Sequence, residues 1–344
     1  MGFRVGIRTK SGPGVGLGHL VRSLSLGEAL RREGVHVLLL CDRGTARAAS
    51  EVGFDFPVVE TGASFSEGEL SLIFGLSLDW VVVDSYEAPT SYLKALVGEG
   101  LKVLLFDDNA DVHPVIWAHL LVNGNVHAER LTYRTMEGTR GLLGPRHLVM
   151  HPSYWEGSRD GRDEGYLLLT LGGGSTGGVL GLLVQMASRI EVPAVAVAGP
   201  AMPEEELKEL RALALRLEGM RLVERPRGLG ELIAGSRAVV CGCGTTVYEV
   251  LTSRKPAVGL VVARNQRLIG EALSDLGLPV FDATEGLDLE ELAPAVARAF
   301  EDPLSARERL EGLFSLFDGK GAIRVAQEML AWGEGPYPSP QAWP

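Results

Sequence analysis

Short runs of leucine and β-branched residues alternate along the chain with longer segments in which apolar residues recur at helical spacing. This alternation is typical of βαβ units, in which a helix joins two parallel strands, and it predicts an α/β protein. The expected strands are Phe3–Arg8, Val35–Cys41, Phe56–Val59, Trp80–Asp84, Val103–Phe106, Leu120–Val122, Tyr166–Leu171, Ala194–Ala198, Arg221–Val223, Ala238–Cys241, Ala257–Val261 and Pro279–Phe281. The expected helices include His19–Gly34, Thr90–Gly98, Gly177–Ile190, Pro203–Leu217, Thr245–Thr252, Asn265–Leu276 and Ala322–Trp332.

The polar stretch Glu156–Gly165 has charged and turn-forming residues without periodicity, and we interpret it as a linker. It separates a Rossmann-like domain of residues 1–155 from a second Rossmann-like domain of residues 166–320. Residues 321–344 are expected to form a C-terminal helix and a Pro-rich tail. Two doubly wound domains of this kind are expected to face one another across a cleft, and their ligands bind beyond the carboxyl ends of the strands. Functional residues are therefore sought directly after strands.

The composition is that of a globular protein, with 344 residues of which 46% are hydrophobic and 22% charged. The formal net charge of −11 argues against a nucleic-acid binder, because such a protein needs positive surface to displace counterions. No apolar stretch approaches the roughly 20 residues that span a bilayer, and no signal-peptide core is evident, so we expect a soluble, cytoplasmic protein without membrane insertion. Three cysteines, Cys41, Cys241 and Cys243, are expected to be small buried residues rather than a disulfide framework or a zinc site.

A glycine-rich turn, Gly12–Gly18, lies between the first expected strand and the first expected helix. Counted from Gly14 and Gly16, a dinucleotide fingerprint would need its third glycine at position 19, which is His19, so a nicotinamide or flavin site is not expected. His19 instead lies in the first turn of a helix, where the helix dipole favours the neutral imidazole that a general base needs. Position alone leaves a second interpretation open, in which His19 only closes the helix end. The apolar face of this helix is predicted to be Leu20, Leu24, Leu26 and Leu30.

Two turns in the second half combine glycine with hydroxyl residues after a strand, at Leu171–Ser175 and within Val239–Leu251. Backbone N–H groups at a helix start, together with hydroxyl groups, can bind an anion such as phosphate. The residues considered for this role are Gly173, Gly174, Ser175, Gly244, Thr245 and Thr246. Glu249, one helical turn further on, could accept hydrogen bonds from a ribose diol.

The adjacent acids Asp107 and Asp108 suggest a magnesium site, but neighbouring residues of an extended chain point to opposite faces, so at most one should enter the cleft. We take Asp108 as a substrate or orienting contact. Asp84, which ends a buried strand, is expected to be structural and to bond backbone near the glycine turn. The arginines that could add positive charge to the site are Arg8, Arg22 and Arg264. Arg22 is counted among the substrate contacts, although surface solvation is the alternative for each arginine.

The order of motifs resembles the UDP-2,4-diacetamido-2,4,6-trideoxy-β-L-altropyranose hydrolase family of pseudaminic acid biosynthesis and its relatives among spore-coat polysaccharide proteins. A more distant resemblance is to the N-acetylglucosaminyltransferase of peptidoglycan lipid II synthesis. The resemblance covers nearly the whole chain. The motifs that carry it are GLGHLVRSLSLGEAL, VVVDSY (Val81–Tyr86), LLFDDNAD (Leu104–Asp111), LVNGN (Leu121–Asn125), LLGPRHLVMHPSYW (Leu142–Trp155), LTLGGGS, CGCGTTVYE and VVARNQ (Val261–Gln266).

This resemblance implies a GT-B fold, UDP bound mainly by the C-terminal domain, and hydrolysis at the anomeric centre with release of UDP. His19 looks like the catalytic histidine of the family's G-x-G-H turn, to which Gly16 and Gly18 also belong. Tyr86 matches the tyrosine of the family's D-S-Y motif. The matches on the substrate side are Asn265 and Gln266, an N-Q pair beside the substrate, and Glu249, the ribose-binding glutamate of the wider GT-B group. No cofactor or metal is implied, and no protein partner is indicated.

Three departures from the family pattern fall in turns that are expected to line the cleft. The family's R-x-D, N-Q-N and G-G-S-D-P are here Arg8-Thr9-Lys10, Asn123-Gly124-Asn125 and Gly172-Gly173-Gly174-Ser175-Thr176. Lys10, Gly124 and Thr176 therefore predict that the same fold acts on a different sugar.

Cleaving a sugar from UDP scarcely needs a general acid, because the departing diphosphate is a weak base. One base and positive potential for the diphosphate suffice, and we expect His19 and the helix starts at Gly244–Thr246 and Gly174–Thr176 to supply them without a metal. The expected function is hydrolysis of a UDP-activated acetamido or diacetamido deoxy sugar in nonulosonic-acid or surface-polysaccharide biosynthesis. The alternatives are a glycosyltransferase, in which His19 deprotonates an acceptor hydroxyl, and a nucleotide-sugar binding protein without activity.

Overall fold

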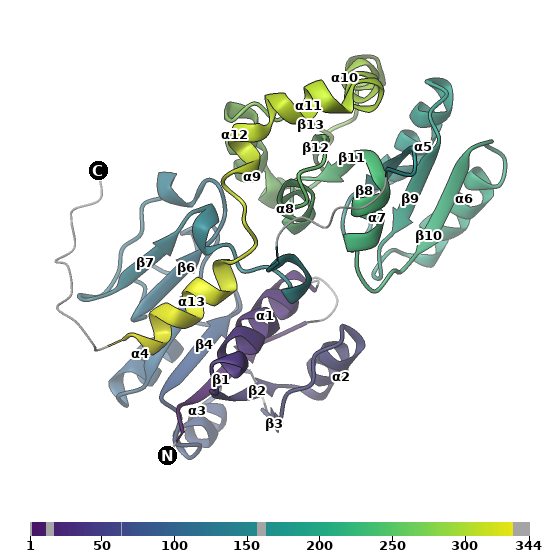
Figure 1. The fold of residues 1–344 in the computed structure, drawn as a ribbon. Helices are drawn as coiled ribbons and strands as arrows, with labels where there is room; N and C mark the ends of the chain where they lie inside the picture. Colours follow the sequence, from purple (N-terminus) through teal and green to yellow (C-terminus); the bar gives the residue numbers. More distant parts are fainter. Residues whose placement is uncertain (1, 12–16, 63, 157–162, 333–344) are drawn as a thin grey trace. The chain divides into compact units, whose positions relative to one another are not determined.

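The computed structural model describes residues 2–11, 17–62, 64–156 and 163–332. The chain divides into two compact units: unit 1 is Met1–Pro152 with Gly319–Pro344, and unit 2 is Ser153–Asp318. Each unit is a parallel sheet with helices packed on it (Figure 1). Within the described ranges, no helix is both long enough and apolar enough to cross a bilayer.

The sheet of unit 1 has the order β3-β2-β1-β4-β5-β6-β7, with all strands parallel. Its strands are β1 (Arg4–Thr9), β2 (His36–Cys41), β3 (Val58–Glu60), β4 (Trp80–Asp84), β5 (Lys102–Phe106), β6 (Leu120–Asn123) and β7 (Arg140–Leu143). Its helices are α1 (Gly18–Arg32), α2 (Arg43–Glu51), α3 (Glu67–Phe74), α4 (Thr90–Gly98) and α13 (Gly321–Leu330), with 3-10 turns η1 (Ala128–Arg130) and η2 (Pro145–His147). The short strand β7 was not expected, because arginine and glycine fill the first half of its four residues.

Helices cover both faces of this sheet because its strands are apolar on both sides. Alternate strand residues such as Val81, Val83 and Leu105 pack with α3 and α4 in one core. Helix α1 packs against β1, β2 and β4, and α13, which returns to unit 1 from the end of unit 2, lies beside it (Figure 1). The apolar face predicted for α1, from Leu20 to Leu30, is fully buried, which confirms that prediction.

Unit 2 repeats the scheme with the strand order β10-β9-β8-β11-β12-β13. Its strands are β8 (Tyr166–Thr170), β9 (Ala194–Ala198), β10 (Met220–Glu224), β11 (Ser236–Gly242), β12 (Ala257–Val261) and β13 (Val280–Asp282). Its helices are α5 (Val179–Arg189), α6 (Glu204–Ala214), α7 (Gly230–Gly235), α8 (Thr245–Thr252), α9 (Arg267–Asp275), α10 (Leu289–Glu301), α11 (Pro303–Arg309) and α12 (Glu311–Phe314). Its 3-10 turns are η3 (Pro152–Tyr154) and η4 (Arg264–Gln266). The first residue of η3, Pro152, is the last residue of the first segment of unit 1. Helices α5, α6 and α10 share one core with the sheet.

Both sheets have a topological switch point, where the strand order reverses and ligands of doubly wound proteins bind. In unit 1 it lies between β1 and β4, and in unit 2 between β8 and β11. At the second of these the two strand ends approach closely, since a Cβ on Gly242 would lie 2.7 Å from the carbonyl oxygen of Leu171. Only glycine permits this approach, and it brings the glycine turns that follow β8 and β11 side by side.

The three cysteines are buried and free, as expected from their number and spacing.

Candidate functional site

A cluster of polar side chains occupies the switch point of unit 1. Its members come from the loops and helix that follow four neighbouring strands, which places them at one edge of the sheet. They are His19 and Arg22 on α1, Asp84 at the end of β4, Tyr86 just beyond it, Asp108 after β5 and Asn125 after β6.

The imidazole of His19 is held by the carboxylate of Asp84, with Nδ1 2.5 Å from Oδ1. Because an ionised carboxylate can only accept, Nδ1 must carry the proton and donate it. The Asp84 side chain has no exposed surface, whereas that of His19 is 13% exposed. The pair therefore fixes the tautomer in which Nε2 has a free lone pair, and in the described part of the chain no hydrogen bond engages that nitrogen.

Arg22 joins Asp84 to Asp108. Its Nε and Nη2 donate to the two oxygens of Asp84 at 2.8 and 2.7 Å, and its Nη1 donates to both oxygens of Asp108 at 2.8 Å. Burial raises the pKa of the Asp84 carboxyl, but the charge of Arg22 and the hydrogen bonds from Arg22 and His19 outweigh it and hold that pKa well below its usual range. Burial and the charge of Arg22 oppose one another in the same way at Asp108, whose pKa is also lowered. Both carboxylates are therefore ionised at neutral pH.

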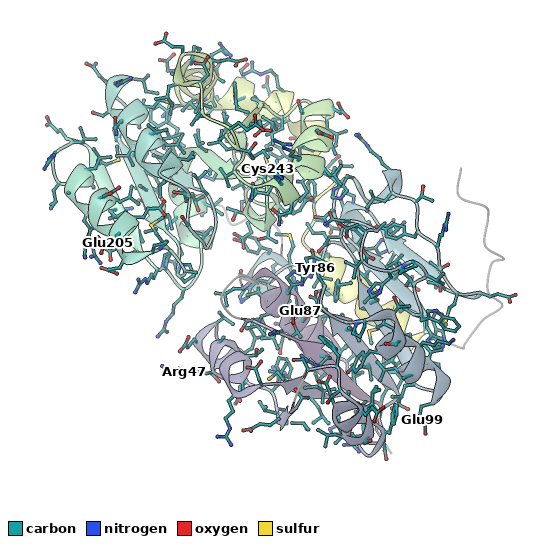
Figure 2. All side chains as sticks on the ribbon, turned by 180° about the vertical axis from the view of Figure 1, so that it is seen from behind. Arg47, Tyr86, Glu87, Glu99, Glu205 and Cys243 are labelled. Carbon is teal, nitrogen blue, oxygen red and sulfur yellow. The ribbon has the colours of Figure 1, made fainter. Side chains whose placement is uncertain are left out.

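Tyr86 stands next to the histidine. Its ring centroid lies 4.6 Å from that of His19, with the ring planes at 89°. Its hydroxyl donates to Oδ2 of Asp108 at 2.5 Å, and the residue is 43% exposed. The next residue, Glu87, lies beside Tyr86 (Figure 2). Glu87 pairs with Lys10 at 2.8 Å, so one of the three departures from the family pattern contacts the residue that follows Tyr86.

Two expectations for unit 1 are wrong. Asp84 was expected to bond backbone, but it bonds the side chains of His19, Arg22 and Ser23. Solvation was the alternative for Arg22, yet its side chain is only 16% exposed and its donors point at two carboxylates. One signal was available, because His19 and Arg22 are three residues apart and so share a helix face.

Arg8 lies outside this cluster. Its Nε donates to Glu69 of α3 at 2.7 Å, and the two side chains are 1% and 0% exposed. Tyr92 donates to the same carboxylate at 2.7 Å. The charge of Arg8 is thus compensated within the core of unit 1, which contradicts the idea that it adds positive potential to the site.

The acids after β5 diverge as the alternation of an extended chain predicts. Asp107 accepts from the backbone N–H groups of Asn109 and Ala110, while Asp108 faces Arg22. Nowhere in the described ranges do three or more histidine, cysteine or acidic side chains gather in a way that could hold a metal.

Gly124 has a packing reason for being glycine. A Cβ on it would lie 2.3 Å from Cα of Leu148. The flanking Asn123 and Asn125 bond one another, and Asn125 Nδ2 also donates to Oδ1 of Asp108 at 2.7 Å. The asparagine pair therefore adds a second side-chain donor to Oδ1 of Asp108 beside Arg22, a role that the sequence did not reveal.

At the switch point of unit 2, helix α8 begins with open backbone donors. Its N-cap is Gly244, and no side chain of the described chain caps it. Thr245 is exposed and Thr246 is buried in its first turn. The amide of Gln266 lies beside this turn, since a Cβ on Gly244 would be 3.4 Å from its Nε2, and its Oε1 accepts from the N–H of Val262 at 2.9 Å.

Glu249 lies on α8 one turn beyond Thr245. Burial raises the pKa of its carboxyl to about 7. No side chain or backbone group in the described ranges donates a hydrogen bond to it. A partly buried carboxyl without a donor is suited to accept hydrogen bonds from an incoming ligand.

The second glycine turn of unit 2 is already occupied by a side chain. Glu206 of α6 accepts hydrogen bonds from the hydroxyls of Ser175 and Thr176 and from the N–H groups of Thr176 and Gly178. These donors lower the pKa of Glu206 against the effect of its burial. A diphosphate could use this helix start only by displacing the carboxylate, so the predicted role of Ser175 has a competitor within the chain.

The remaining candidates have simple positions. Gly18 is the first residue of α1, and Gly16 lies outside the described residues. Gly173 and Gly174 are in the turn after β8, where a Cβ on Gly174 would meet nothing within 4 Å. Asn265 and Arg264 are exposed in η4.

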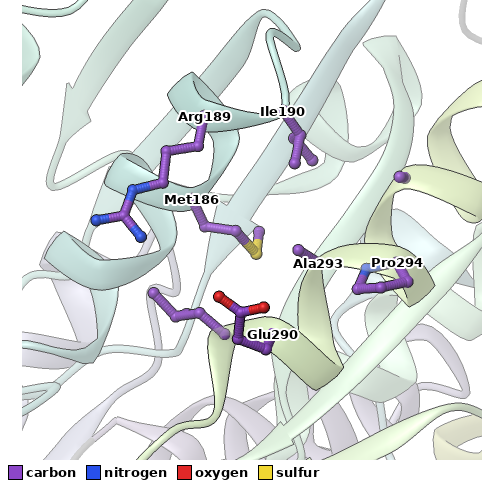
Figure 3. A pocket seen from close by; sticks show the side chains of 8 residues that line it. Met186, Arg189, Ile190, Glu290, Ala293 and Pro294 are labelled. Atoms are coloured by element: carbon purple, nitrogen blue, oxygen red, sulfur yellow. The ribbon is translucent and has the colours of Figure 1, made fainter.

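A hollow of about 340 Å³ on unit 2 lies elsewhere (Figure 3). Met186, Arg189 and Ile190 line it from the C-terminal end of α5, and residues from Leu289 to Ala297 line it from α10. Since α5 starts at the carboxyl end of β8 and runs back along the sheet, this hollow lies toward the opposite end of the strands from the switch point.

Comparison with known proteins supports the resemblance drawn from the motifs. No protein-family model matches the chain. It is 24% identical to the spore coat polysaccharide biosynthesis protein SpsG of Bacillus subtilis over 94% of this chain and 96% of that protein. The chain is also 22% identical to the uncharacterized protein MJ1062 of Methanocaldococcus jannaschii over 77% of its own length, but that match spans 57% of the archaeal protein.

Solved structures establish the GT-B fold of the chain. MurG of Acinetobacter baumannii superposes with a TM-score of 0.62, covering 96% of this chain and 99% of MurG at 14% identity. HepE of Anabaena, solved in complex with UDP, gives a TM-score of 0.63 with 96% and 99% coverage at 12% identity. UGT89C1 of Arabidopsis thaliana gives 0.65 with 95% and 99% coverage at 12% identity.

Proposed function

We propose that this protein hydrolyses a UDP-activated sugar, with His19 as the general base that activates water. The observation that carries this proposal is the His19–Asp84 pair, which holds the imidazole with Nε2 as an acceptor at the switch point of unit 1. In serine hydrolases a buried aspartate orients a histidine in the same manner. Tyr86 and Asp108 complete the catalytic group beside this base.

The reaction balances with one base. The water oxygen bonds to the anomeric carbon while the bond from that carbon to the diphosphate oxygen breaks, and the electron pair leaves with UDP. His19 Nε2 takes one water proton, and the imidazolium is stabilised by the ionised Asp84 until the proton passes to solvent. No general acid is required for a leaving group as weakly basic as a diphosphate.

Unit 2 is proposed to bind the UDP. The uncapped start of α8 offers backbone N–H groups and the hydroxyl of Thr245 to the diphosphate, and glycine at position 244 lets the phosphate approach. Glu249 would accept hydrogen bonds from the ribose diol. These bonds would lower its raised pKa and so favour the ionised carboxylate. Asn265 and Gln266 lie next to this turn, where they can contact the sugar.

The names of the relatives support the substrate class that we propose. SpsG is named for spore coat polysaccharide biosynthesis, and HepE has been solved with UDP and with UDP-glucose. We infer a UDP-linked acetamido or diacetamido deoxy sugar that feeds nonulosonic-acid or surface-polysaccharide synthesis. Lys10, beside Glu87 and Tyr86, is the residue on the sugar side that we expect to set the difference from the family substrate.

A glycosyltransferase is the rival function, and the same base could deprotonate an acceptor hydroxyl. Purified chain incubated with candidate UDP-sugars and no acceptor distinguishes the two. We expect UDP and free sugar from the parent chain, and from His19→Ala a rate at least about 10³-fold lower with UDP affinity retained. UDP release only in the presence of an acceptor would favour the transferase, and a His19→Ala rate within a few fold of the parent would exclude His19 as the base.

A further inference from the structure

The proton of Tyr86 has a fixed direction. Asp108 is surrounded by donors: Arg22 Nη1 reaches both of its oxygens at 2.8 Å, Asn125 Nδ2 reaches Oδ1 at 2.7 Å, and the hydroxyl of Tyr86 reaches Oδ2 at 2.5 Å. Burial and the charge of Asp108 raise the pKa of Tyr86, so the phenol keeps its proton. Since the carboxylate can only accept, that proton points at Asp108.

The consequence is that Tyr86 offers only lone pairs to anything else that approaches its oxygen. His19 Nε2 likewise offers only a lone pair, because Asp84 fixes the proton on Nδ1. The two rings are 4.6 Å apart between centroids, and both side chains retain exposed surface. Two acceptors side by side are complementary to a molecule that donates two protons from one atom.

We propose that Asp108 is a positioning residue that fixes Tyr86 as a hydrogen-bond acceptor, and that the site thereby selects water over an alcohol as the nucleophile. The inference rests on the proposed function, in which His19 is the base. Water donates one proton to His19, which removes it, and the other to Tyr86; that second proton stays on the oxygen and becomes part of the new sugar hydroxyl. An alcohol has one proton, so its oxygen would present a lone pair to the lone pairs of Tyr86.

The surroundings of Asp108 make the Asp108→Asn variant informative. Asn125 Nδ2 already donates to Oδ1 of residue 108 and to Oδ1 of Asn123, so it cannot face an amide nitrogen. The new amide must therefore keep its oxygen toward Asn125 and turn its nitrogen toward Tyr86. The phenol then accepts from residue 108 and directs its own proton toward the nucleophile, which reverses its polarity.

The test measures hydrolysis and methanolysis of one UDP-sugar in buffer with added methanol, scored as free sugar and methyl glycoside. We expect Tyr86→Phe to lower the hydrolysis rate about 10- to 30-fold and to raise the ratio of methyl glycoside to free sugar several-fold, as expected for loss of one hydrogen bond in the transition state. Asp108→Asn should do the same. In the Tyr86→Phe background, Asp108→Asn should leave the product ratio unchanged, because Asp108 acts on the choice of nucleophile through Tyr86, whereas the loss of the Arg22–Asp108 pair lowers both rates alike.

Tyr92→Phe is the matched control, because the Tyr92 hydroxyl also donates to a buried carboxylate, Glu69, but lies in the core of unit 1. Its product ratio should equal that of the parent. UDP affinity and melting temperature are measured for every variant, so that Tyr86→Phe, which leaves the Arg22–Asp108 pair intact, carries the test if Asp108→Asn unfolds.

Unchanged product ratios in Tyr86→Phe, or a further change of the product ratio in the double variant, would overturn this inference while leaving His19-dependent hydrolysis standing. A parent chain that releases UDP only to a hydroxyl acceptor would overturn both this inference and the proposed function.

Discussion

The two switch points have the same strand topology but opposite states of pairing. In unit 1, Arg22 bridges Asp84 and Asp108, and each charge has its partner before any ligand arrives. In unit 2, helix α8 starts without a side-chain cap, and Glu249 has no hydrogen-bond donor in the described ranges. Paired charges hold neighbouring groups in one tautomer and orientation, whereas unpaired donors and acceptors are ready for a ligand. In the proposed function, the carboxyl end of one sheet therefore serves catalysis, because its polar side chains bond one another. The same end of the other sheet serves binding, because some of its polar groups have no partner.

The largest effect is expected from a variant that breaks the His19–Asp84 pair of unit 1. Asp84→Asn removes the acceptor that fixes the His19 tautomer, and we expect the hydrolysis rate to fall about 10³- to 10⁴-fold. UDP affinity, measured by calorimetry, should change less than about three-fold, because UDP is proposed to bind unit 2. The control is Asp79→Asn, which alters an aspartate that accepts from the Arg4 backbone at the other end of the sheet. A rate within ten-fold of the parent would show that Asp84 does not orient the base.

The second prediction concerns the stability of the same cluster. Arg22→Lys replaces a fork that bonds two carboxylates with a single ammonium group that cannot reach both in the same geometry. We expect the free energy of unfolding of unit 1 to fall by about 2–4 kcal/mol, since one buried carboxylate loses its partner. Chemical denaturation measures this, and Arg31→Lys, at an exposed arginine that pairs with Glu28, should leave the unfolding midpoint nearly unchanged. Equal effects of the two variants would contradict the role given to Arg22.

The third prediction tests the unpaired state of Glu249. Its folded pKa of about 7 exceeds its ordinary value of 4.5, so the folded protein binds more protons between these values and its stability should fall as pH rises through that window. Glu249→Gln should remove this fall, which makes the variant more stable than the parent at pH 8 by about 2 kcal/mol after allowance for partial exposure. The same variant should bind UDP about 10-fold more weakly at pH 8, because an amide is a poorer acceptor for the ribose hydroxyls.

Thermal melts across pH and UDP calorimetry check both parts of the Glu249 prediction. Glu271→Gln, on α9, serves as the control. Weaker UDP binding without the change in pH dependence would mean that Glu249 contacts UDP but is not desolvated in the free chain.

The smallest expected effect concerns the turn that Glu206 closes. Glu206→Ala frees the donors of Ser175, Thr176 and Gly178, and it should lower the melting temperature slightly, by the equivalent of about 1 kcal/mol. If the diphosphate uses this helix start, UDP should bind two- to five-fold more tightly in the variant. Glu205→Ala, which removes a glutamate of α6 that pairs with Lys208, is the control. Unchanged UDP affinity would leave the start of α8 as the phosphate site of unit 2.

The glycine turns and most strands of both sheets could be predicted from the pattern of residues. Hydrophobic period and turn chemistry are local properties, which is why Leu20–Leu30 could be assigned to a buried face and Gly244–Thr246 to a helix start without further information. The placement of His19 in a first helical turn followed from the same local rules. The strand β7 was missed because Arg140 and Gly141 weaken the local signal and neighbouring strand pairing overrides it.

Side-chain pairs that join different strands could not be predicted in this way. His19 and Asp84 are 65 positions apart, and Arg22 and Asp108 are 86 apart, so their meeting depends on the strand order that places β1 beside β4 and β4 beside β5. The glutamate that closes the turn after β8 comes from α6, and the residue that requires glycine at position 124 is Leu148. None of these contacts leaves a trace in spacing or composition.

The sequence by itself determined most of the elements, the turns after the strands and the place of His19 in a first helical turn, because local periodicity and backbone chemistry control them. Tertiary structure alone decided which carboxylate orients His19, which arginine joins the two acids and which glycine turn of unit 2 is left open. The reason is that hydrogen bonds and ion pairs select their partners by distance, and the distances are set by the order of strands in a sheet rather than by the order of residues in the chain.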